Sequence, residues 1–399
     1  MSDFVLVLNA GSSSLKYSLV DAVTGHEAAS GTVQQIGEPS GVLNHSAPSG
    51  EQRSERPFVN HADALQAVMD AFTDHGPSLA DVTLRAVGHR VVHGGARFSV
   101  PVLIDDALVE AVQSLVPLAP LHNPANLEGI ATARALFPDL PQVAVFDTAF
   151  HQTLPPHAYT YAVPLSLREE HQIRRYGFHG TSYSFVAAEA ARVLGRPLSD
   201  LNLIVLHLGN GASATAIERG RSVDTSMGIS PLEGLVMGTR SGDVDPALHA
   251  HLHRQLGWSI DDVDRVLNRE SGLRGLSGYN DFRDVDRWRQ FGDEGPMLAF
   301  DVFCYRIRKY VGAYYAVLGT VDAVVFTAGV GENAASMRAA ALSGLERLGI
   351  AVDGERNDQR SDEPWLISPE GSEVAVLVVQ TNEEWEIARQ AMAVVGSAG

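Results

Sequence analysis

The chain has 399 residues, 45% hydrophobic and 20% charged, a composition typical of a globular α/β protein with two domains of roughly 150 to 200 residues. A net charge of −18 argues against a nucleic acid or an anionic membrane as partner, because a phosphate surface needs a basic face. One cysteine, Cys304, excludes an internal disulfide framework, and without a leader or an apolar stretch near the roughly 20 residues of a membrane span we expect a cytoplasmic protein.

Residues 4–17 predict two strands joined by a small-residue turn. An apolar run gives a buried strand, Asn9, Gly11 and three serines form the turn, and residues 15–20 resume the strand. The N–H groups and hydroxyls of the turn, the missing side chain of Gly11 and the cation Lys16 suit a phosphate tail. On its own, this stretch is explained about as well by an ordinary β-hairpin with a polar tip.

The next three segments predict a loop, a helix and a strand. Residues 37–56 are rich in Gly, Pro, Ser and charge, and we expect an exposed loop or an edge turn without chemistry. Residues 62–72 have apolar residues at helical spacing, which predicts a helix packed on the sheet. Residues 84–95 then predict a buried strand that ends in a Gly-Gly turn.

Two histidines and an arginine lie on this last strand, where polar groups are costly unless they pair or line a cleft. His89 and His93 are four residues apart, so we expect them on one side of the strand. For each of them, a hydrogen-bonded structural histidine is favoured over a ligand. Arg90 points to the opposite face, and its planar guanidinium suits a carboxylate or phosphate, so it is the better candidate for binding an anion.

A loop and a β-α-β pattern follow. Three prolines predict a loop over 117–126, followed by a short helix over 127–137 and a strand over 142–146. Asp147 comes directly after this strand, and ligands in open α/β sheets gather at the carboxyl ends of strands. We therefore expect Asp147 and the loop residue His122 in one cleft, although a surface position is slightly favoured for His122 taken alone.

We place the boundary between the two domains near residue 150, before a proline-rich and aromatic stretch. An amphipathic helix is predicted over 183–194, with Thr181 or Ser182 as its N-cap. His179 lies between glycine-flanked residues just before this helix, and a donating histidine near a helix start suits an anion.

The first strand-turn-strand unit recurs in the second half of the chain. Residues 205–213 match residues 5–13 at Val, Leu, Leu, Gly and Ser when Gly211 is aligned with Gly11. Two copies indicate a duplicated domain, and two such turns facing each other across a cleft suit the two ends of a polyphosphate. A single structural hairpin predicts no second copy, so the repeat favours nucleotide binding.

Residues 238–243 place Arg240 on a glycine-flanked loop, which suits a mobile charged finger better than a packed helix face. His249, His251 and His253 follow. Because no cysteine or carboxylate accompanies them at ligand spacing, a solvated helix face is favoured over a metal site.

Residues 321–328 predict a central strand that runs into a Gly-rich turn at 329–333 and then a helix. Backbone N–H groups at the helix start and bare glycine surface suit a base or a ribose. The pattern lacks the third glycine and the acidic residue of a Rossmann fingerprint, and the chain has no P-loop sequence. Residues 381–384 open a terminal helix that is expected to end by residue 395.

Together these motifs resemble the acetokinase family, in the superfamily of acetate and sugar kinases, heat-shock ATPases and actin. The resemblance covers essentially the whole chain. It implies an α/β fold of duplicated RNase H-like (actin-like ATPase) domains with an active-site cleft between them, at residues 1–150 with the returning helix 383–399, and at 151–382. The motifs that carry it, in the family's order, are Asn9-Ala-Gly-Ser-Ser-Ser, Gly88-His-Arg-Val-Val-His-Gly-Gly, Leu121-His-Asn-Pro, Phe146-Asp-Thr-Ala-Phe-His, Tyr176-Gly-Phe-His-Gly, His207-Leu-Gly-Asn-Gly, Gly238-Thr-Arg-Ser-Gly-Asp, Gly329-Val-Gly-Glu-Asn and Thr381-Asn-Glu-Glu.

The resemblance also implies the site residues. It assigns Asn9 and Glu383 to a site for Mg²⁺ or Mn²⁺, Asp147 to the active-site acid, and His179 and Arg240 to stabilisers of the transition state. The implied substrate-binding residues are Arg90 for the carboxylate, His122, and the apolar Val92, Leu121, Phe178 and Pro231 for the acyl methyl. The implied ATP-binding residues are Lys16, His207, Leu208, Gly209, Asn210, Gly211, Asp281, Phe282, Arg283, Gly329, Val330, Gly331, Glu332 and Asn333.

The implied activity is that of a homodimeric acetate kinase, which transfers the γ-phosphoryl group of ATP directly and reversibly to acetate, giving acetyl phosphate and ADP. A carboxylate is already ionised near neutral pH, so this transfer needs no general base. We therefore expect Asp147 to organise magnesium or water rather than to act as a base.

Three alternatives stay open at this point. A propionate or butyrate kinase is the nearest, since one or two methylenes change discrimination by only about 1 to 3 kcal/mol. An ATP-driven clamp like the heat-shock ATPases or actin shares the duplicated turns but does not need Arg90 and an apolar pocket. A bare acyl-phosphate hydrolase is disfavoured by the adenosine-type loop at Gly329.

Overall fold

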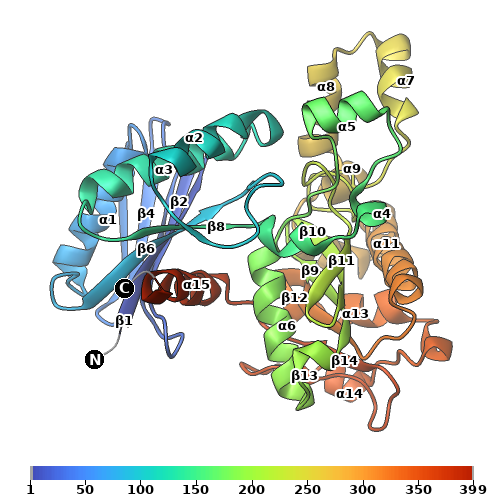
Figure 1. Cartoon of the computed structure of the whole chain (residues 1–399). Helices are drawn as coiled ribbons and strands as arrows, with labels where there is room; N and C mark the ends of the chain where they lie inside the picture. Colours follow the sequence, from blue (N-terminus) through green and yellow to red (C-terminus); the bar gives the residue numbers. More distant parts are fainter. Residues whose placement is uncertain (1–2, 398–399) are drawn as a thin grey trace. The chain divides into compact units, whose positions relative to one another are not determined.

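The computed structural model describes residues 3–397. The chain divides into two compact units, which are Met1–Gln152 with Asn382–Gly399 (unit 1) and Thr153–Thr381 (unit 2). Each unit is a β-sheet covered by helices, which confirms the predicted α/β class (Figure 1). Among residues 3–397, no helix is both long enough and apolar enough to cross a membrane.

Unit 1 is built on an eight-stranded sheet. Its strands are β1 (Asp3–Gly11), β2 (Ser14–Asp21), β3 (Glu27–Gln34), β4 (Gly41–Ala47), β5 (Gly50–Arg56), β6 (Thr83–Val91), β7 (Val102–Leu103) and β8 (Gln142–Phe146), in the order β5-β4-β3-β2-β1-β6-β8-β7. Strands β1 to β5 pair antiparallel in sequence order, and β6 and β8 extend the sheet in parallel. Its helices are α1 (His61–His75), α2 (Asp106–Ser114), α3 (Asn123–Leu136) and α15 (Glu383–Ser397), with 3₁₀ turns at Val116–Leu118 and Ala149–Thr153.

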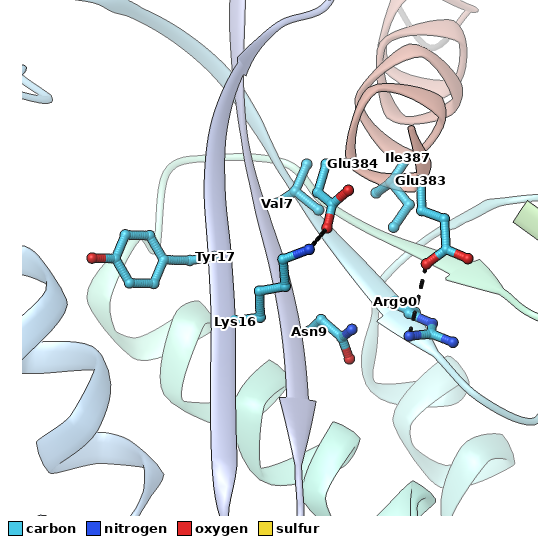
Figure 2. A pocket seen from close by; sticks show the side chains of 8 residues that line it. All are labelled: Val7, Asn9, Lys16, Tyr17, Arg90, Glu383, Glu384 and Ile387. Carbon is cyan, nitrogen blue, oxygen red and sulfur yellow. Dashed lines mark hydrogen bonds and ion pairs between the residues drawn. The ribbon is translucent and has the colours of Figure 1, made fainter. Parts of the chain in front are cut away.

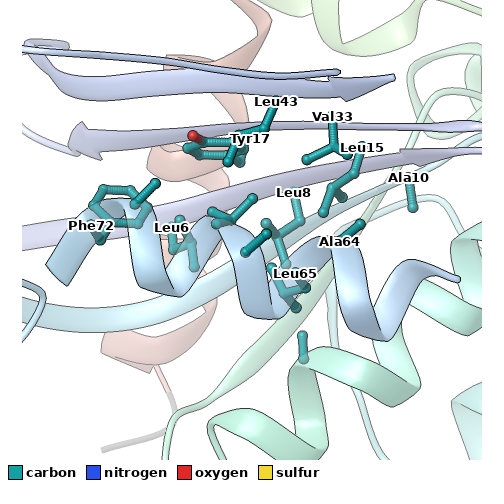
Figure 3. Close-up of a cluster of buried hydrophobic side chains, with 14 of the residues drawn as sticks. Leu6, Leu8, Ala10, Leu15, Tyr17, Val33, Leu43, Ala64, Leu65 and Phe72 are labelled. Carbon is teal, nitrogen blue, oxygen red and sulfur yellow. The ribbon is translucent and has the colours of Figure 1, made fainter. Parts of the chain in front are cut away.

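Alternation along β1 explains why helices cover both faces of this sheet. Leu6 and Leu8 face a cluster that α1 and α3 complete with residues such as Leu65, and Figure 3 shows this packing. The intervening residues Val5 and Val7 face the opposite way, against Ile387, Ala388 and Ala391 of α15. Because side chains of a strand point alternately to its two faces, one apolar strand supports both layers.

Unit 2 contains a six-stranded sheet in the order β11-β10-β9-β12-β14-β13, and α6 packs against β9 and β12 while α11 packs against β10 and β9. The strands are β9 (Asn202–Leu208), β10 (Ala212–Glu218), β11 (Arg221–Thr225), β12 (Ala323–Thr327), β13 (Trp365–Leu366) and β14 (Ala375–Val378). The helices are α4 (Pro156–Tyr159), α5 (Leu165–His171), α6 (Gly180–Leu194), α7 (Ala247–Leu256), α8 (Ile260–Arg265), α9 (Gly272–Ser277), α10 (Phe282–Arg289), α11 (Glu294–Leu318), α12 (Ala328–Asn333), α13 (Ala335–Leu342) and α14 (Gly354–Asn357). Val266–Glu270 is a π-helical turn, and Leu198–Asp200 and Glu346–Leu348 are 3₁₀ turns.

The predicted repeat is present in both sheets. The hairpin β1–β2 closes with Gly11 opposite Ser14, and the hairpin β9–β10 closes with Leu208 opposite Ala212. In each unit the first strand of the hairpin also has a parallel neighbour, which is β6 for β1 and β12 for β9. The matching turns therefore occupy equivalent places in two similar sheets.

Two predicted loops were wrong. Residues 37–56 contain the strands β4 and β5. Every residue of the edge strand β5 is exposed, so its sequence has no apolar alternation that would indicate a strand. The loop predicted over 117–126 is shorter than expected, because α3 already begins at Asn123. Pro124 fits its first turn, where the missing N–H costs nothing.

Three local predictions also need correction. The strand β6 ends at Val91, so His93 lies beyond it and not on one side of a strand with His89. The N-cap of α6 is His179 rather than Thr181 or Ser182. The Gly-rich segment 329–333 is not a separate turn, because α12 begins at Ala328 directly after β12.

Candidate active site

Arg90 and Asp147 form an ion pair at the carboxyl ends of two neighbouring strands. Nε of Arg90 donates to Oδ1 of Asp147 at 3.0 Å, and Nη2 donates to Oδ2 at 2.7 Å. Burial alone would lower the pKa of Arg90, but the carboxylates of Asp147 and Glu383 outweigh it and raise this pKa. Asp147 therefore fixes the plane of the guanidinium, whose Nη1 lies 4.0 Å from Oε2 of Glu383.

Glu383, from the C-terminal helix, lies beside Arg90. It is the first residue of α15, and it lines one pocket together with Asn9, Lys16 and Arg90 (Figure 2). Burial raises the pKa of Glu383, although Arg90 opposes this effect. Nζ of Lys16 pairs with Oε1 of Glu384. Packing of α15 on the sheet of unit 1 thus gathers Asn9, Lys16, Arg90 and Glu383, which are far apart in the sequence.

His179 and Arg240 flank the glycine turn between β9 and β10. His179 has a left-handed backbone with φ of 60°, a conformation that costs a non-glycine residue about 1 to 3 kcal/mol and is concentrated at functional sites. Its ring stacks on that of His207 with centroids 4.1 Å apart, and its Nδ1 lies 2.9 Å from Oγ of Ser213. A Cβ added to Gly211 would lie 3.7 Å from both Nη1 of Arg240 and Nε2 of His179, so both groups face this turn.

Arg240 is a partly buried cation that forms no ion pair with an acidic side chain of residues 3–397. Its Nη1 donates to the carbonyl of Pro231 at 3.2 Å, and burial lowers its pKa. No carboxylate within residues 3–397 forms an ion pair with it. Since a desolvated charge without a counter-ion is costly, Arg240 is suited to receive an anionic group of a substrate.

A pocket of about 810 Å³ lies beside this turn in unit 2. Its volume falls within the roughly 300 to 1,000 Å³ of small-molecule sites. The predicted ATP-binding residues that line it are Gly209, Asn210, Asp281, Phe282, Arg283, Gly329, Val330 and Asn333. The structure therefore brings three separate sequence segments to one pocket whose volume is typical of small-molecule sites.

Sequence reasoning missed several residues that line this pocket. They are Gly238, Leu273, Asn280, Asp286, Ala334 and Arg360. Gly238 is the first residue of the motif that contains Arg240, and Asn280 directly precedes the predicted segment 281–283, so both had a usable signal in the sequence. Leu273, Asp286 and Arg360 belong to no motif, and only the packing of separate segments reveals them.

The remaining predicted ATP-binding residues lie outside the lining of this pocket. Leu208 and Gly331 are buried, and Nδ1 of the buried His207 lies 2.9 Å from Oγ of Ser182. Oε1 of Glu332 accepts from the backbone N–H of Thr381 at 3.1 Å. Lys16 lines the pocket of unit 1 instead.

The residues predicted to bind the acyl group are divided between the two units. Val92 and Leu121 belong to unit 1, where Leu121 is 53% exposed. Phe178 and Pro231 belong to unit 2, where Phe178 is buried. His122 takes the N-cap position of α3 in unit 1. A shared apolar pocket stays a prediction.

Known proteins resemble the chain along its whole length. The sequence model of the acetokinase family matches residues 4–389. Acetate kinase of Streptomyces avermitilis is 57% identical over 396 residues, covering 99% of this chain and 98% of that protein. The crystal structure of Porphyromonas gingivalis acetate kinase matches at 42% identity with a TM-score of 0.94, covering 98% of this chain and 100% of that one. A propionate kinase from Francisella tularensis matches at 42% identity with a TM-score of 0.92, covering 98% and 99%. The chain belongs to the acetokinase family.

Proposed function

We propose that this protein is an acetate kinase, which transfers the γ-phosphoryl group of ATP to acetate in a reversible, in-line reaction that yields acetyl phosphate and ADP. The observation that carries the proposal is the cation Arg240, which lies beside His179 at the glycine turn and forms no ion pair with a carboxylate of residues 3–397. Phosphoryl transfer spreads negative charge over the equatorial oxygens of the moving group, and a positioned arginine is the group that neutralises it. The names of the relatives supply the acceptor.

We assign Arg90 to binding the carboxylate of the phosphoryl acceptor. Acetate is ionised near neutral pH, so it needs a cation and no general base. Asp147 accepts two hydrogen bonds from Arg90 and thereby orients the guanidinium towards the acceptor. This role differs from the organisation of magnesium or water that the sequence suggested. Beside Arg90, we assign His122 to substrate binding and Val92, Leu121, Phe178 and Pro231 to the acyl methyl.

We assign the binding of the phosphoryl donor, ATP, to unit 2. The pocket lined by Asn210, Asp281 and Gly329 fits the adenosine, and the glycine turn Gly209–Gly211 receives the phosphates. Arg240 and Nε2 of His179 then lie where the transferred group passes, because both flank Gly211. These positions support the assignment of Arg240 and His179 to the transition state rather than to nucleotide recognition.

Asn9 and Glu383 fit a divalent cation such as Mg²⁺ or Mn²⁺. Mg²⁺ is usually bound by one or two carboxylates together with substrate phosphates and waters, and this pocket offers the amide oxygen of Asn9 and the partly buried carboxylate of Glu383. Asn9 and Glu383 would hold the ion, which would supply positive charge to offset that of the phosphates. The nearby cations Arg90 and Lys16 would offset the remaining negative charge of the phosphates.

The test is magnesium-dependent formation of ADP from ATP without an acid, then with acetate, propionate and butyrate in turn. We expect turnover that requires an acid and favours acetate. A preference for propionate would leave the proposed mechanism of phosphoryl transfer unchanged but would make propionate the acceptor. This outcome is tested because the chain also matches a propionate kinase. ADP release indifferent to any short acid would contradict the proposal.

The same resemblance leads us to propose a homodimer in the cytoplasm. Sedimentation velocity of the purified protein is the measurement for the oligomeric state, and a single species of monomer mass would contradict it. Fractionation of the cells that make it tests the location.

A further inference from the structure

A second segment forms backbone hydrogen bonds along the loop that carries Arg240. We call residues 237–241 the Arg240 loop and residues 267–274 the latch segment. Their backbone hydrogen bonds, donor first, are Leu273 N to Met237 O (2.9 Å), Arg274 N to Gly238 O (2.9 Å), Ser271 N to Thr239 O (3.0 Å) and Ser241 N to Leu267 O (3.0 Å). Such regular pairing of two irregular segments fixes the path of the loop.

The two segments are in backbone contact. Gly272 has a φ of +62°, and a Cβ added there would lie 2.1 Å from the carbonyl oxygen of Met237 and 2.6 Å from that of Arg240. The latch segment begins within the π-helical turn Val266–Glu270, and such turns are frequent at functional sites. The backbone of Gly272 therefore packs directly against that of Met237 and Arg240, with no space for a side chain between them.

Thr239 adds a side-chain bond to this arrangement. Its Oγ1 donates to the carbonyl of Asn268 in the π-helical turn at 2.9 Å. The neighbouring Gly238 and the latch residue Leu273 both line the large pocket of unit 2. The Arg240 loop and the latch segment thus form part of the wall of the proposed nucleotide pocket.

We propose that Thr239 is a positioning residue, whose hydroxyl ties the Arg240 loop to the π-helical turn and holds the guanidinium of Arg240 at the glycine turn. This inference rests on the proposed function. A displacement of about 1 Å at a reacting centre costs on the order of a hundredfold in rate, so one lost anchor has a measurable effect. Because Arg240 acts on the transition state, the loss should reduce kcat and leave KM unchanged.

The test is a mutant cycle on the full-length protein. We expect Thr239→Val, which keeps the shape and removes the hydroxyl, to lower kcat about tenfold with both KM values within about twofold of wild type. Thr239→Ser should restore kcat. In an Arg240→Ala background, Thr239→Val should cause no further loss, because the hydroxyl acts through the missing guanidinium. The matched control is Ser372→Ala, which removes the hydroxyl bond to the carbonyl of Pro369 (2.8 Å) far along the chain from the loop.

The outcomes separate this inference from the proposed function. Wild-type kcat in Thr239→Val overturns the positioning role. An equal loss of kcat in the wild-type and Arg240→Ala backgrounds also overturns it, since it would show a general structural effect. Absence of acid-dependent turnover in the wild type itself contradicts the proposed function instead.

Discussion

The replacement Asp147→Asn tests how the acceptor site is built. It keeps one oxygen for Arg90 but removes the charge and turns an amide N–H towards the second guanidinium donor, so we expect one of the two hydrogen bonds to be lost. A hydrogen bond to a charged group contributes about 1.5 to 3 kcal/mol, and 1.36 kcal/mol corresponds to a tenfold change. The expected loss in kcat/KM for acetate is therefore about 10- to 150-fold.

The assay is ADP formation at a series of acetate concentrations and pH values. The shape of the pH–rate profile should stay that of the wild type, because an ionised acceptor needs no base. Asp106→Asn is a suitable control, since Asp106 forms an exposed ion pair with Arg134 at 2.9 Å and such pairs contribute little. Loss of one limb of the profile would refute the reasoning and make Asp147 a base, and an unchanged kcat/KM would refute its role in orienting Arg90.

Three further predictions concern other parts of the molecule. Arg240→Ala should reduce kcat by about 10³ to 10⁵ and change KM for ATP far less, and steady-state kinetics within about tenfold of wild type would contradict its role. Burial lowers the pKa of His89 from 6.5 to about 4, against its bond to Gln142. The folded protein then binds fewer protons than the unfolded chain between pH 6.5 and 4, so this group should make the free energy of unfolding fall by about 3 kcal/mol as the pH drops through that window. Urea unfolding at several pH values measures the fall, and His89→Gln should flatten it. Burial raises the pKa of Cys304 to about 12, so a thiol reagent at neutral pH should modify it only after unfolding, and rapid labelling of the native protein would contradict this.

The sequence predicted the parts of the site that lie at the ends of strands. Asn9, Arg90 and Asp147 stand on or directly after apolar runs, and parallel strands carry such residues to one edge of a sheet. The pairing of Arg90 with Asp147 was not predictable in the same way. It depends on the register of β6 and β8, which places Arg90 opposite Val145, and no local pattern encodes that register.

Other features were missed because their signals are tertiary. Leu273 and Arg360 line the large pocket from segments without a motif, so only the packing of unit 2 identifies them. The edge strand β5 is exposed throughout and therefore has the composition of a loop. Glu383 was assigned through a family resemblance, because nothing in its own neighbourhood points to β1 or β6.

The packing of α15 has a consequence for how the protein is made. Ile387, Ala388 and Ala391 cover Val5, Val7 and their neighbours on one face of the first sheet, yet a ribosome synthesises them after all of unit 2. The nascent first sheet must therefore keep an apolar face uncovered while more than half of the chain is still being translated. We expect chains truncated before residue 382 to be bound by chaperones or degraded, so that the helix supplying Glu383 also acts as a check on complete synthesis.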